Sequence, residues 1–243
     1  MRTARTTAAT AGALLIAGTV AGVLSVVPSV DGDAYLIDAA AHAGQLTMGA
    51  FFQLLMAVAY VGVAVLLFPV LRAHDESLAL GFVGSRIVAG VFLVAGAVAL
   101  LLLLRLSQGF VSAGASDASF FHVIGGLMRA GRDLLNHVGM ILAVSVGGLM
   151  LYSILYRARL VPRWLAGWGF AGTVLAMVAS FLVMFRRVEI VSPPYLLLNV
   201  PIALEEMVLA GWLIVKGFSR QFLYDNGDVR MTARVVGPTA RGS

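Results

Sequence analysis

Six apolar runs, each about 20 residues or longer, constrain the fold of this chain more than any other feature. A helix needs about 20 consecutive apolar residues to cross the hydrocarbon core of a bilayer. Charged residues, prolines or glycines bound the runs, at approximately residues 8–27, 46–71, 79–106, 134–156, 164–185 and 195–215. They predict an all-α polytopic membrane protein, a bundle of six transmembrane helices.

The composition agrees with this class. Of the 243 residues, 60% are hydrophobic and 12% are charged, whereas a soluble domain carries about 25% charged residues. The absence of cysteine excludes disulfides, thiolate metal sites and cysteine nucleophiles. The net charge of +5 comes mainly from arginines in short loops and tails, which indicates membrane topology rather than nucleic-acid binding. The lipid bilayer is therefore the expected partner.

The first run has a second interpretation, because Arg2 and Arg5 before an apolar stretch are also typical of a secretory signal peptide. Its apolar part, however, is closer to 20 residues than to a signal-peptide core, and no clear Ala-x-Ala cleavage pattern precedes Asp31. We therefore expect the first run to remain as a helix of the mature protein.

The distribution of Lys and Arg predicts the orientation, since cytoplasmic loops are enriched in these residues. One side of the membrane would hold Arg2, Arg5, Arg72, Arg157, Arg159, Arg163, Lys216, Arg220, Arg230, Arg234 and Arg241. The other side would hold Arg105, Arg129, Arg132, Arg186 and Arg187. This asymmetry predicts a multi-pass protein of the cell membrane with both termini in the cytoplasm. It divides the chain into a transmembrane domain (1–216) and a basic, disordered cytoplasmic tail (217–243) near anionic headgroups.

Two adjacent acidic residues, Glu205 and Glu206, lie near the middle of the sixth run, about 15 Å from either end of a helix. Charge at this depth is costly, so it normally faces the bundle interior and a partner. The two side chains point about 100° apart, and only one can face a given partner squarely. Asn199 lies seven residues before Glu206 and shares its face.

Arg86, in the third run, is the natural counter-charge for this pair, and its long side chain can reach either glutamate. Three alternatives follow: a purely structural ion pair, a proton-linked or substrate-binding site, or no contact at all. The residues Glu205, Glu206, Arg86 and Asn199 form the predicted intramembrane polar site.

A second polar group precedes and begins the fourth run. Arg129, Asp133, Asn136 and His137 recur at three- and four-residue spacing, which predicts a polar stripe on the outer part of one helix.

The predicted topology also places His42, His122 and His137 on the outer side. Three histidines with a carboxylate would suit zinc or another divalent metal, but these come from separate segments without a diagnostic spacing. We predict no cofactor and keep these histidines as a secondary metal hypothesis.

Three segments carry a resemblance to a known family. They are the opening TARTTAATAGALLIAG, then YRARLVPRWLAGWGFAG (Tyr156–Gly172), and PIALEEMVLAGWLIVKGFS (Pro201–Ser219). Together with the spacing of the six runs, they resemble the bacterial membrane family called domain of unknown function, DUF4386. The resemblance covers most of the chain and implies six spans in a membrane, but no activity.

The family pattern implied by this resemblance is a basic loop, then Val-Pro-Arg-Trp-Leu, and later a mid-helix acidic residue before Trp-Leu-Ile-Val-Lys-Gly-Phe. These fall on Val161–Leu165, on Glu205 or Glu206, and on Trp212–Phe218. The pattern also implies a glutamate shortly after Arg86, where this chain reads Val-Ala-Gly. That departure makes Arg86 more dependent on the sixth helix.

Two functional hypotheses follow. The first is an intramembrane protein that binds or transports a small molecule, an ion or a proton at the Glu/Arg site. The second is a membrane enzyme or redox protein with a metal at the outer histidines. A structural or regulatory protein without a site of its own is a third alternative, and none of the sequence motifs favours an enzyme.

Overall fold

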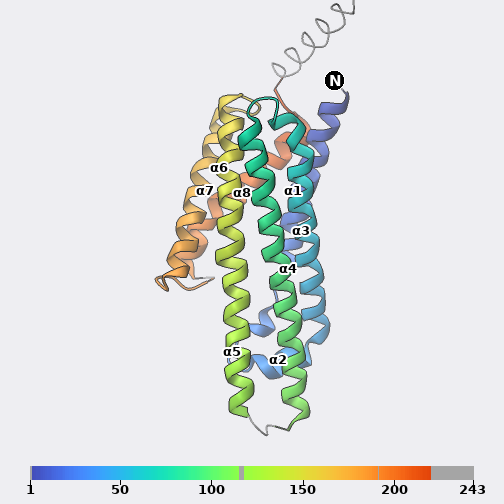
Figure 1. The fold of residues 1–243 in the computed structure, drawn as a ribbon, viewed down its shortest axis with the longest axis vertical. Coiled ribbons are helices and arrows are strands. Elements are labelled where there is room, and N and C mark those ends of the chain that lie inside the picture. Colours follow the sequence, from blue (N-terminus) through green and yellow to red (C-terminus); the bar gives the residue numbers. More distant parts are fainter. Residues whose placement is uncertain (1, 115–117, 191, 220–243) are drawn as a thin grey trace, which may run out of the picture.

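The computed structural model describes residues 2–114, 118–190 and 192–219, and helices dominate all three segments (Figure 1). The elements are α1 (Arg2–Leu24), η1 (Pro28–Val30), α2 (Tyr35–Ala41), α3 (Ala43–Leu71), α4 (Glu76–Ser112), α5 (Ala118–Leu134), the π-helix η2 (Leu135–Met140), α6 (Ile141–Arg157), α7 (Arg163–Met184) and α8 (Pro193–Val215). Six helices are long and apolar enough to cross a membrane, which confirms the predicted all-α six-helix bundle. Most of the predicted tail, residues 220–243, lies outside the described residues.

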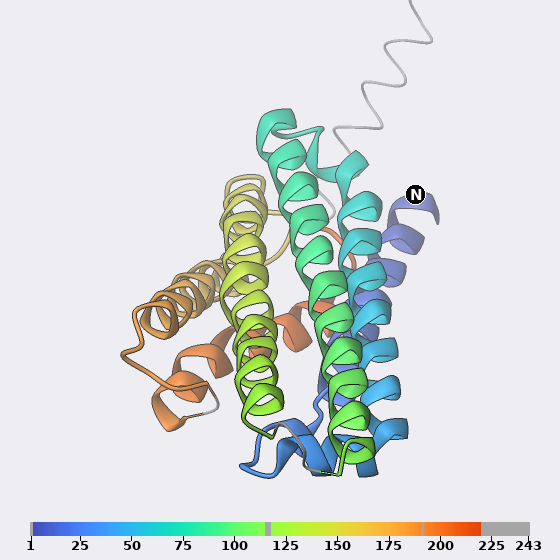
Figure 2. The ribbon, with the colours of Figure 1, turned by 60° about the horizontal axis from the view of Figure 1, so that its bottom comes forward.

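The six long helices form a closed ring. Each one packs against the next along the chain, in the order α1, α3, α4, α6, α7 and α8, and α8 packs back onto α1 (Figures 1 and 2). α5, η2 and α6 together make one continuous helix of 40 residues. This arrangement gives every long helix two neighbours and leaves one shared interior.

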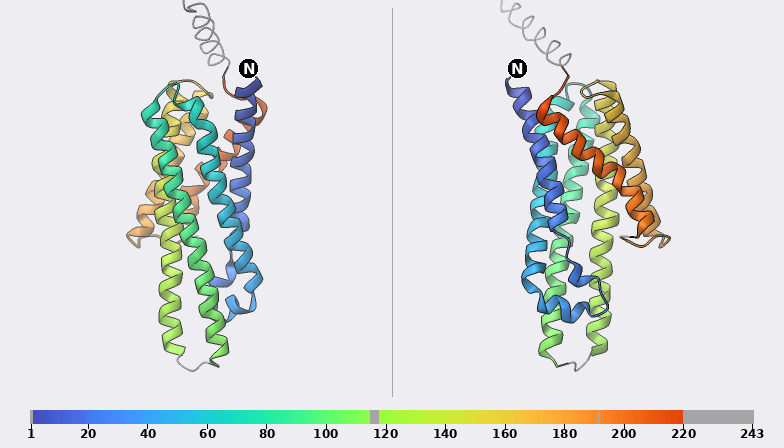
Figure 3. Two further views of the ribbon diagram at one scale, coloured as in Figure 1. Left: turned by 45° about the vertical axis from the view of Figure 1, so that its right-hand side comes forward. Right: turned by 180° about the vertical axis from the view of Figure 1, so that it is seen from behind.

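One segment differs from the sequence-based expectation. The apolar runs at 79–106 and 134–156 predict a hydrophilic connection between them, but α4 continues to Ser112 and α5 begins at Ala118. The 37 residues of α4 extend about 55 Å, whereas the hydrocarbon core is about 30 Å thick. The α4–α5 hairpin therefore projects beyond the other helices (Figure 3). The short helix α2 packs against it, and the Tyr35 hydroxyl donates a hydrogen bond of 3.2 Å to the carbonyl of His122.

Helix α8 crosses the bundle diagonally, from α7 at its beginning to α1 at its end (Figure 3, right). Glycines allow the close approach at both crossings. A Cβ added at Gly172 of α7 would lie 3.1 Å from the Cα of Ile202, and one added at Gly12 of α1 would lie 2.6 Å from the carbonyl oxygen of Ala210. These approaches hold the middle of α8 against α7 and its C-terminal half against α1, and the cavity-lining side of α8 lies opposite α4 and α6.

We expect Gly12→Ala to lower the free energy of unfolding by about 1–3 kcal/mol, because the new methyl group would push α8 away from α1. The matched control is Gly211→Ala, since the same addition meets nothing within 4 Å there. That control should be neutral or stabilise the helix by up to about 1 kcal/mol. Equilibrium unfolding in detergent micelles measures both variants, and equal effects would contradict the packing account.

Candidate functional site

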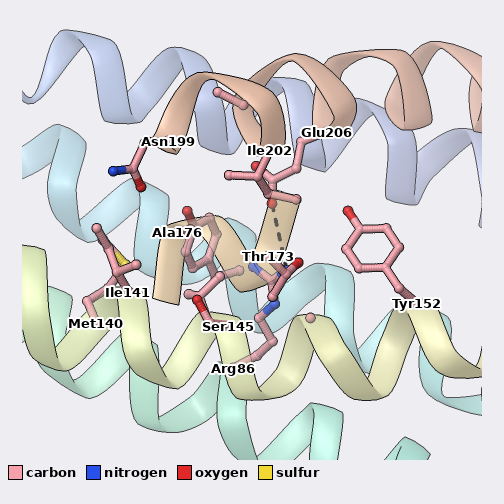
Figure 4. Close-up of a pocket in the computed structure, with 14 residues that line it drawn as sticks. Arg86, Met140, Ile141, Ser145, Tyr152, Thr173, Ala176, Asn199, Ile202 and Glu206 are labelled. Carbon is pink, nitrogen blue, oxygen red and sulfur yellow. Dashed lines mark ion pairs between the residues drawn. The ribbon is translucent and has the colours of Figure 1, made fainter. Parts of the chain in front are cut away.

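A cavity of about 210 Å³ lies between the middle of α8 and the facing parts of α4, α6 and α7. Figure 4 shows side chains from these helices pointing into it. Its wall is mainly apolar, with polar groups from Tyr60, Arg86, Ser145, Tyr152, Thr173, Asn199 and Glu206. A mostly apolar cavity with a few converging polar groups is typical of a small-molecule site.

Arg86 of α4 and Glu206 of α8 face each other across the cavity (Figure 4). The distance from Nη2 of Arg86 to Oε1 of Glu206 is 3.9 Å, and the two side chains are 4% and 19% exposed. This separation allows charge attraction but exceeds the length of a hydrogen bond. The structure therefore pairs Arg86 with Glu206.

The guanidinium of Arg86 has aromatic neighbours in place of hydrogen-bond acceptors. Its Cζ atom lies 4.8 Å from the ring centroid of Tyr60 and 5.4 Å from that of Phe82. Both Nε and Nη1 are buried, and neither has a hydrogen-bond partner among the described residues. Unpartnered buried donors are costly and rare, so these two N–H groups are unusual features of the site.

Glu205 does not line this cavity and is fully buried. The hydroxyl of Tyr152, on α6, donates a hydrogen bond to its Oε2, while its Oε1 has no partner in the described part of the chain. The Tyr152 ring has room beside α7 because position 169 is a glycine, where a Cβ would clash with the ring. The two adjacent glutamates therefore have different partners, as their 100° separation predicts.

The predicted intramembrane site is thus brought together in space. Arg86, Asn199 and Glu206 line the cavity, and Glu205 lies directly beside it. The amide nitrogen of Asn199 donates to the carbonyl of Tyr195, one turn earlier in its own helix, at 2.9 Å.

Sequence reasoning missed two site residues, Tyr60 and Tyr152. Tyrosines of membrane proteins usually belong to the aromatic belts at the membrane surface, so neither residue suggested an interior role. Their depth in the apolar runs was the only available signal.

The four residues of the predicted outer polar stripe have separate contacts, three of them with other parts of the chain and one within α5. Arg129 donates to the carbonyls of Asp31 and Gly32 at 2.5 and 3.3 Å. Asp133 lies 3.3 Å from Arg132. Asn136 accepts a hydrogen bond from Gln53 of α3, and His137 lies 2.8 Å from the hydroxyl of Tyr195 on α8. The contacts of Arg129, Asn136 and His137 join the long α5–η2–α6 helix to its neighbours.

The π-helix η2 contributes to the same network. A π-helical turn shifts the backbone hydrogen-bond pattern, and such turns occur often near functional sites. Here the carbonyl of His137, inside η2, accepts a hydrogen bond of 2.9 Å from the buried hydroxyl of Ser180 on α7. The last residue of η2, Met140, lines the cavity. The irregular turn therefore lies directly at the border of the site.

The secondary metal hypothesis gains no support from this geometry. Across residues 2–114, 118–190 and 192–219, no three His, Asp or Glu side chains lie close enough together to hold a metal ion. His42 contacts the carbonyl of Asp38 in its own segment, His122 lies against the rings of Tyr35 and Phe110, and His137 contacts Tyr195. The predicted topology places the three histidines on the same side of the membrane, but in the structure each has a different partner.

Comparison with known proteins gives one family match. The family profile described as "Domain of unknown function (DUF4386)" matches residues 10–217, which is most of the chain and includes all four residues of the intramembrane site. Searches of curated proteins and of solved structures gave no match. With six helices long and apolar enough to span a bilayer and a family match over nearly all of them, the chain belongs to the DUF4386 family of membrane proteins.

Proposed function

We propose that this membrane protein binds a small molecule in the cavity between α4, α6 and α8, and moves it across the bilayer. The observation that carries the proposal is the guanidinium of Arg86, whose Nε and Nη1 are buried beside a cavity without an acceptor. A ligand with a carboxylate or carbonyl oxygen would supply an acceptor to these donors.

The other polar groups limit the ligand further. Glu206 lies 3.9 Å from Arg86, so its carboxylate could also accept a hydrogen bond from a ligand that carries an N–H or O–H group. A volume of about 210 Å³ is smaller than the roughly 300–1,000 Å³ of drug-sized pockets, which favours a compact molecule. Of the ligands expected from the sequence, a small molecule with an acceptor therefore fits better than an ion or a proton alone.

Three small probes with matched shapes test this proposal. Thermal unfolding of the purified full chain in detergent micelles is measured with propionate, propionamide or ethylammonium at rising concentration. Propionate and propionamide should raise the unfolding temperature, because each supplies an oxygen acceptor to Arg86, and ethylammonium should not. Stabilisation by ethylammonium alone would contradict the proposed role of Arg86.

A cavity-filling variant tests whether the ligand occupies the cavity, without changing the charged residues. Ser145→Leu adds volume to the cavity wall and leaves Arg86 and Glu206 in place, so it should abolish the stabilisation by propionate. Ser153→Leu, two turns further along α6 and outside this cavity, is the matched control and should retain it. Uptake of labelled propionate into vesicles containing the two variants then tests transport.

We also propose that both termini face the cytoplasm of the cell. The end of the bundle at which α1 begins carries Arg72, Arg157, Arg159, Arg163 and Lys216 at helix ends and turns. Cytoplasmic ends of membrane proteins are enriched in such residues. A reporter that is active only in the cytoplasm should therefore give a signal when it is fused after Ser243. A signal from a reporter that is active only in the periplasm or outside the cell would overturn this orientation.

A further inference from the structure

A second hollow, the basic groove, lies at the end of the bundle where α1 begins. It has a volume of about 400 Å³ and lies between the α6–α7 turn and the end of α8. Its basic side chains are Arg159, Arg163 and Lys216, and no acidic side chain of the described residues lines it. The two sequence segments VPRW and WLIVKGF, which are far apart in the chain, form its opposite walls.

The backbone around the groove also favours an anion. Helix α7 begins at Arg163 with no side-chain cap and no acidic residue in its first turn, and the positive end of its dipole lies at the groove. Arg159 has a left-handed backbone conformation, with φ of 51°, which is unfavourable for a residue other than glycine. The fold thus holds Arg159 in a strained conformation beside two other cations.

One buried polar atom gives independent evidence of a missing ligand. The backbone N–H of Ser219 donates to the carbonyl of Leu160 at 3.0 Å, which fixes Ser219 in the groove wall. Its hydroxyl oxygen is buried and has no hydrogen-bond partner in the part of the chain that the structure describes. A hydroxyl donor next to three cations is a common arrangement for holding phosphate oxygens.

The surroundings point to a lipid as the source of the phosphate. Trp212 lines the groove, and Trp164 stacks on Trp168 at the start of α7, with 6.4 Å between ring centroids. Tryptophans gather at the level of lipid headgroups. We propose that the basic groove binds the phosphate of an anionic phospholipid headgroup through Arg159, Arg163, Lys216 and Ser219.

Native mass spectrometry of the purified full chain tests this proposal. The chain in detergent is titrated with a phosphatidylglycerol, and the dissociation constant of the first bound lipid is measured. In the variant Arg159→Gln/Arg163→Gln/Lys216→Gln this constant should rise on the order of a hundredfold, because the lipid phosphate would lose its charge-assisted hydrogen bonds in the groove. All three side chains are exposed, so their replacement leaves the core intact.

The matched control is Arg5→Gln/Arg72→Gln/Arg157→Gln, which removes three exposed cations from the same end of the bundle but none from the groove. It should bind the lipid nearly as well as the unchanged protein. An equal loss in both triple variants would overturn the proposal, because it would show diffuse electrostatic attraction without a site. Equal binding of a diacylglycerol with the same acyl chains would also overturn it, since that lipid lacks phosphate. Displacement of the lipid by inorganic phosphate at low millimolar concentration would overturn the assignment to a lipid and make soluble phosphate the ligand.

Discussion

Replacing Arg86 by methionine is expected to lower the free energy of unfolding by about 3–5 kcal/mol. The side chain is 4% exposed, and its cation is the partner of Glu206, which lies 3.9 Å away on another helix. Removing Arg86 leaves the carboxylate of Glu206 inside the bundle without a positive charge, and such an unpaired buried charge is more costly than the pair itself is favourable. Equilibrium unfolding in detergent micelles gives the value.

The double variant Arg86→Met/Glu206→Leu should recover most of this loss. Two apolar side chains of similar volume can replace a buried ion pair with little or no cost in stability. A double-mutant cycle from the two single variants and the double variant then isolates the interaction between Arg86 and Glu206. A coupling energy near zero would mean that the pair does not stabilise the fold.

Arg105→Met is the matched control for this cycle, because Arg105 is an exposed arginine on the same helix, α4. Its replacement should change the free energy of unfolding by less than about 0.5 kcal/mol. Loss of propionate binding in Arg86→Met/Glu206→Leu, with stability recovered, would separate the role of the pair in binding from its role in folding.

The fold class and the central charges were predictable because membrane insertion leaves strong marks in a sequence. Six apolar runs of spanning length specify six helices, and the high cost of charge in hydrocarbon identifies Arg86, Glu205 and Glu206 as interior residues. The helical angle of 100° per residue even predicts that Glu205 and Glu206 take different partners. Each of these inferences depends on local properties of one helix.

The remaining features depend on how the helices are placed relative to one another, and no local pattern encodes that. The diagonal course of α8 results from close approaches at Gly12 and Gly172, yet the chain has 27 glycines, most of which resemble these two in sequence context. The partnership of Tyr152 with Glu205 requires a register between α6 and α8 that only three-dimensional packing determines. The same limit made the outer histidines appear as one group when their side chains have separate partners.

Helical continuity was the other source of error. Residues 106–133 contain charged and small residues, which reduce hydropathy and suggested a connection, but hydropathy reports burial in lipid and not helical structure. Helix α4 extends to Ser112 and α5 begins at Ala118, and the two helices pack against each other while α2 packs against α4. An amphipathic segment outside the hydrocarbon core can therefore be as helical as the span that it extends.

Tyr152→Phe is expected to lower the free energy of unfolding by about 1–3 kcal/mol, although it removes a single oxygen atom. Tyr152 donates the one hydrogen bond that the side chain of Glu205 accepts among the described residues, and Glu205 is fully buried. Without the hydroxyl, both oxygens of the carboxyl group would be buried and unpartnered. Tyr156→Phe is the control one turn further along α6, since Tyr156 is 46% exposed, and it should change stability by less than about 0.5 kcal/mol.

The double variant Tyr152→Phe/Glu205→Leu distinguishes a lost hydrogen bond from a general weakening of α6. Replacing both partners by apolar groups of similar shape removes the unpartnered carboxyl group, so the double variant should be more stable than Tyr152→Phe alone and close to the unchanged protein. Unfolding curves of the unchanged protein, Tyr152→Phe, Glu205→Leu and the double variant in the same detergent give the comparison. If the double variant were no more stable than Tyr152→Phe, the hydroxyl of Tyr152 would act through some other neighbour than Glu205, and the different roles of the two adjacent glutamates would lose their physical basis.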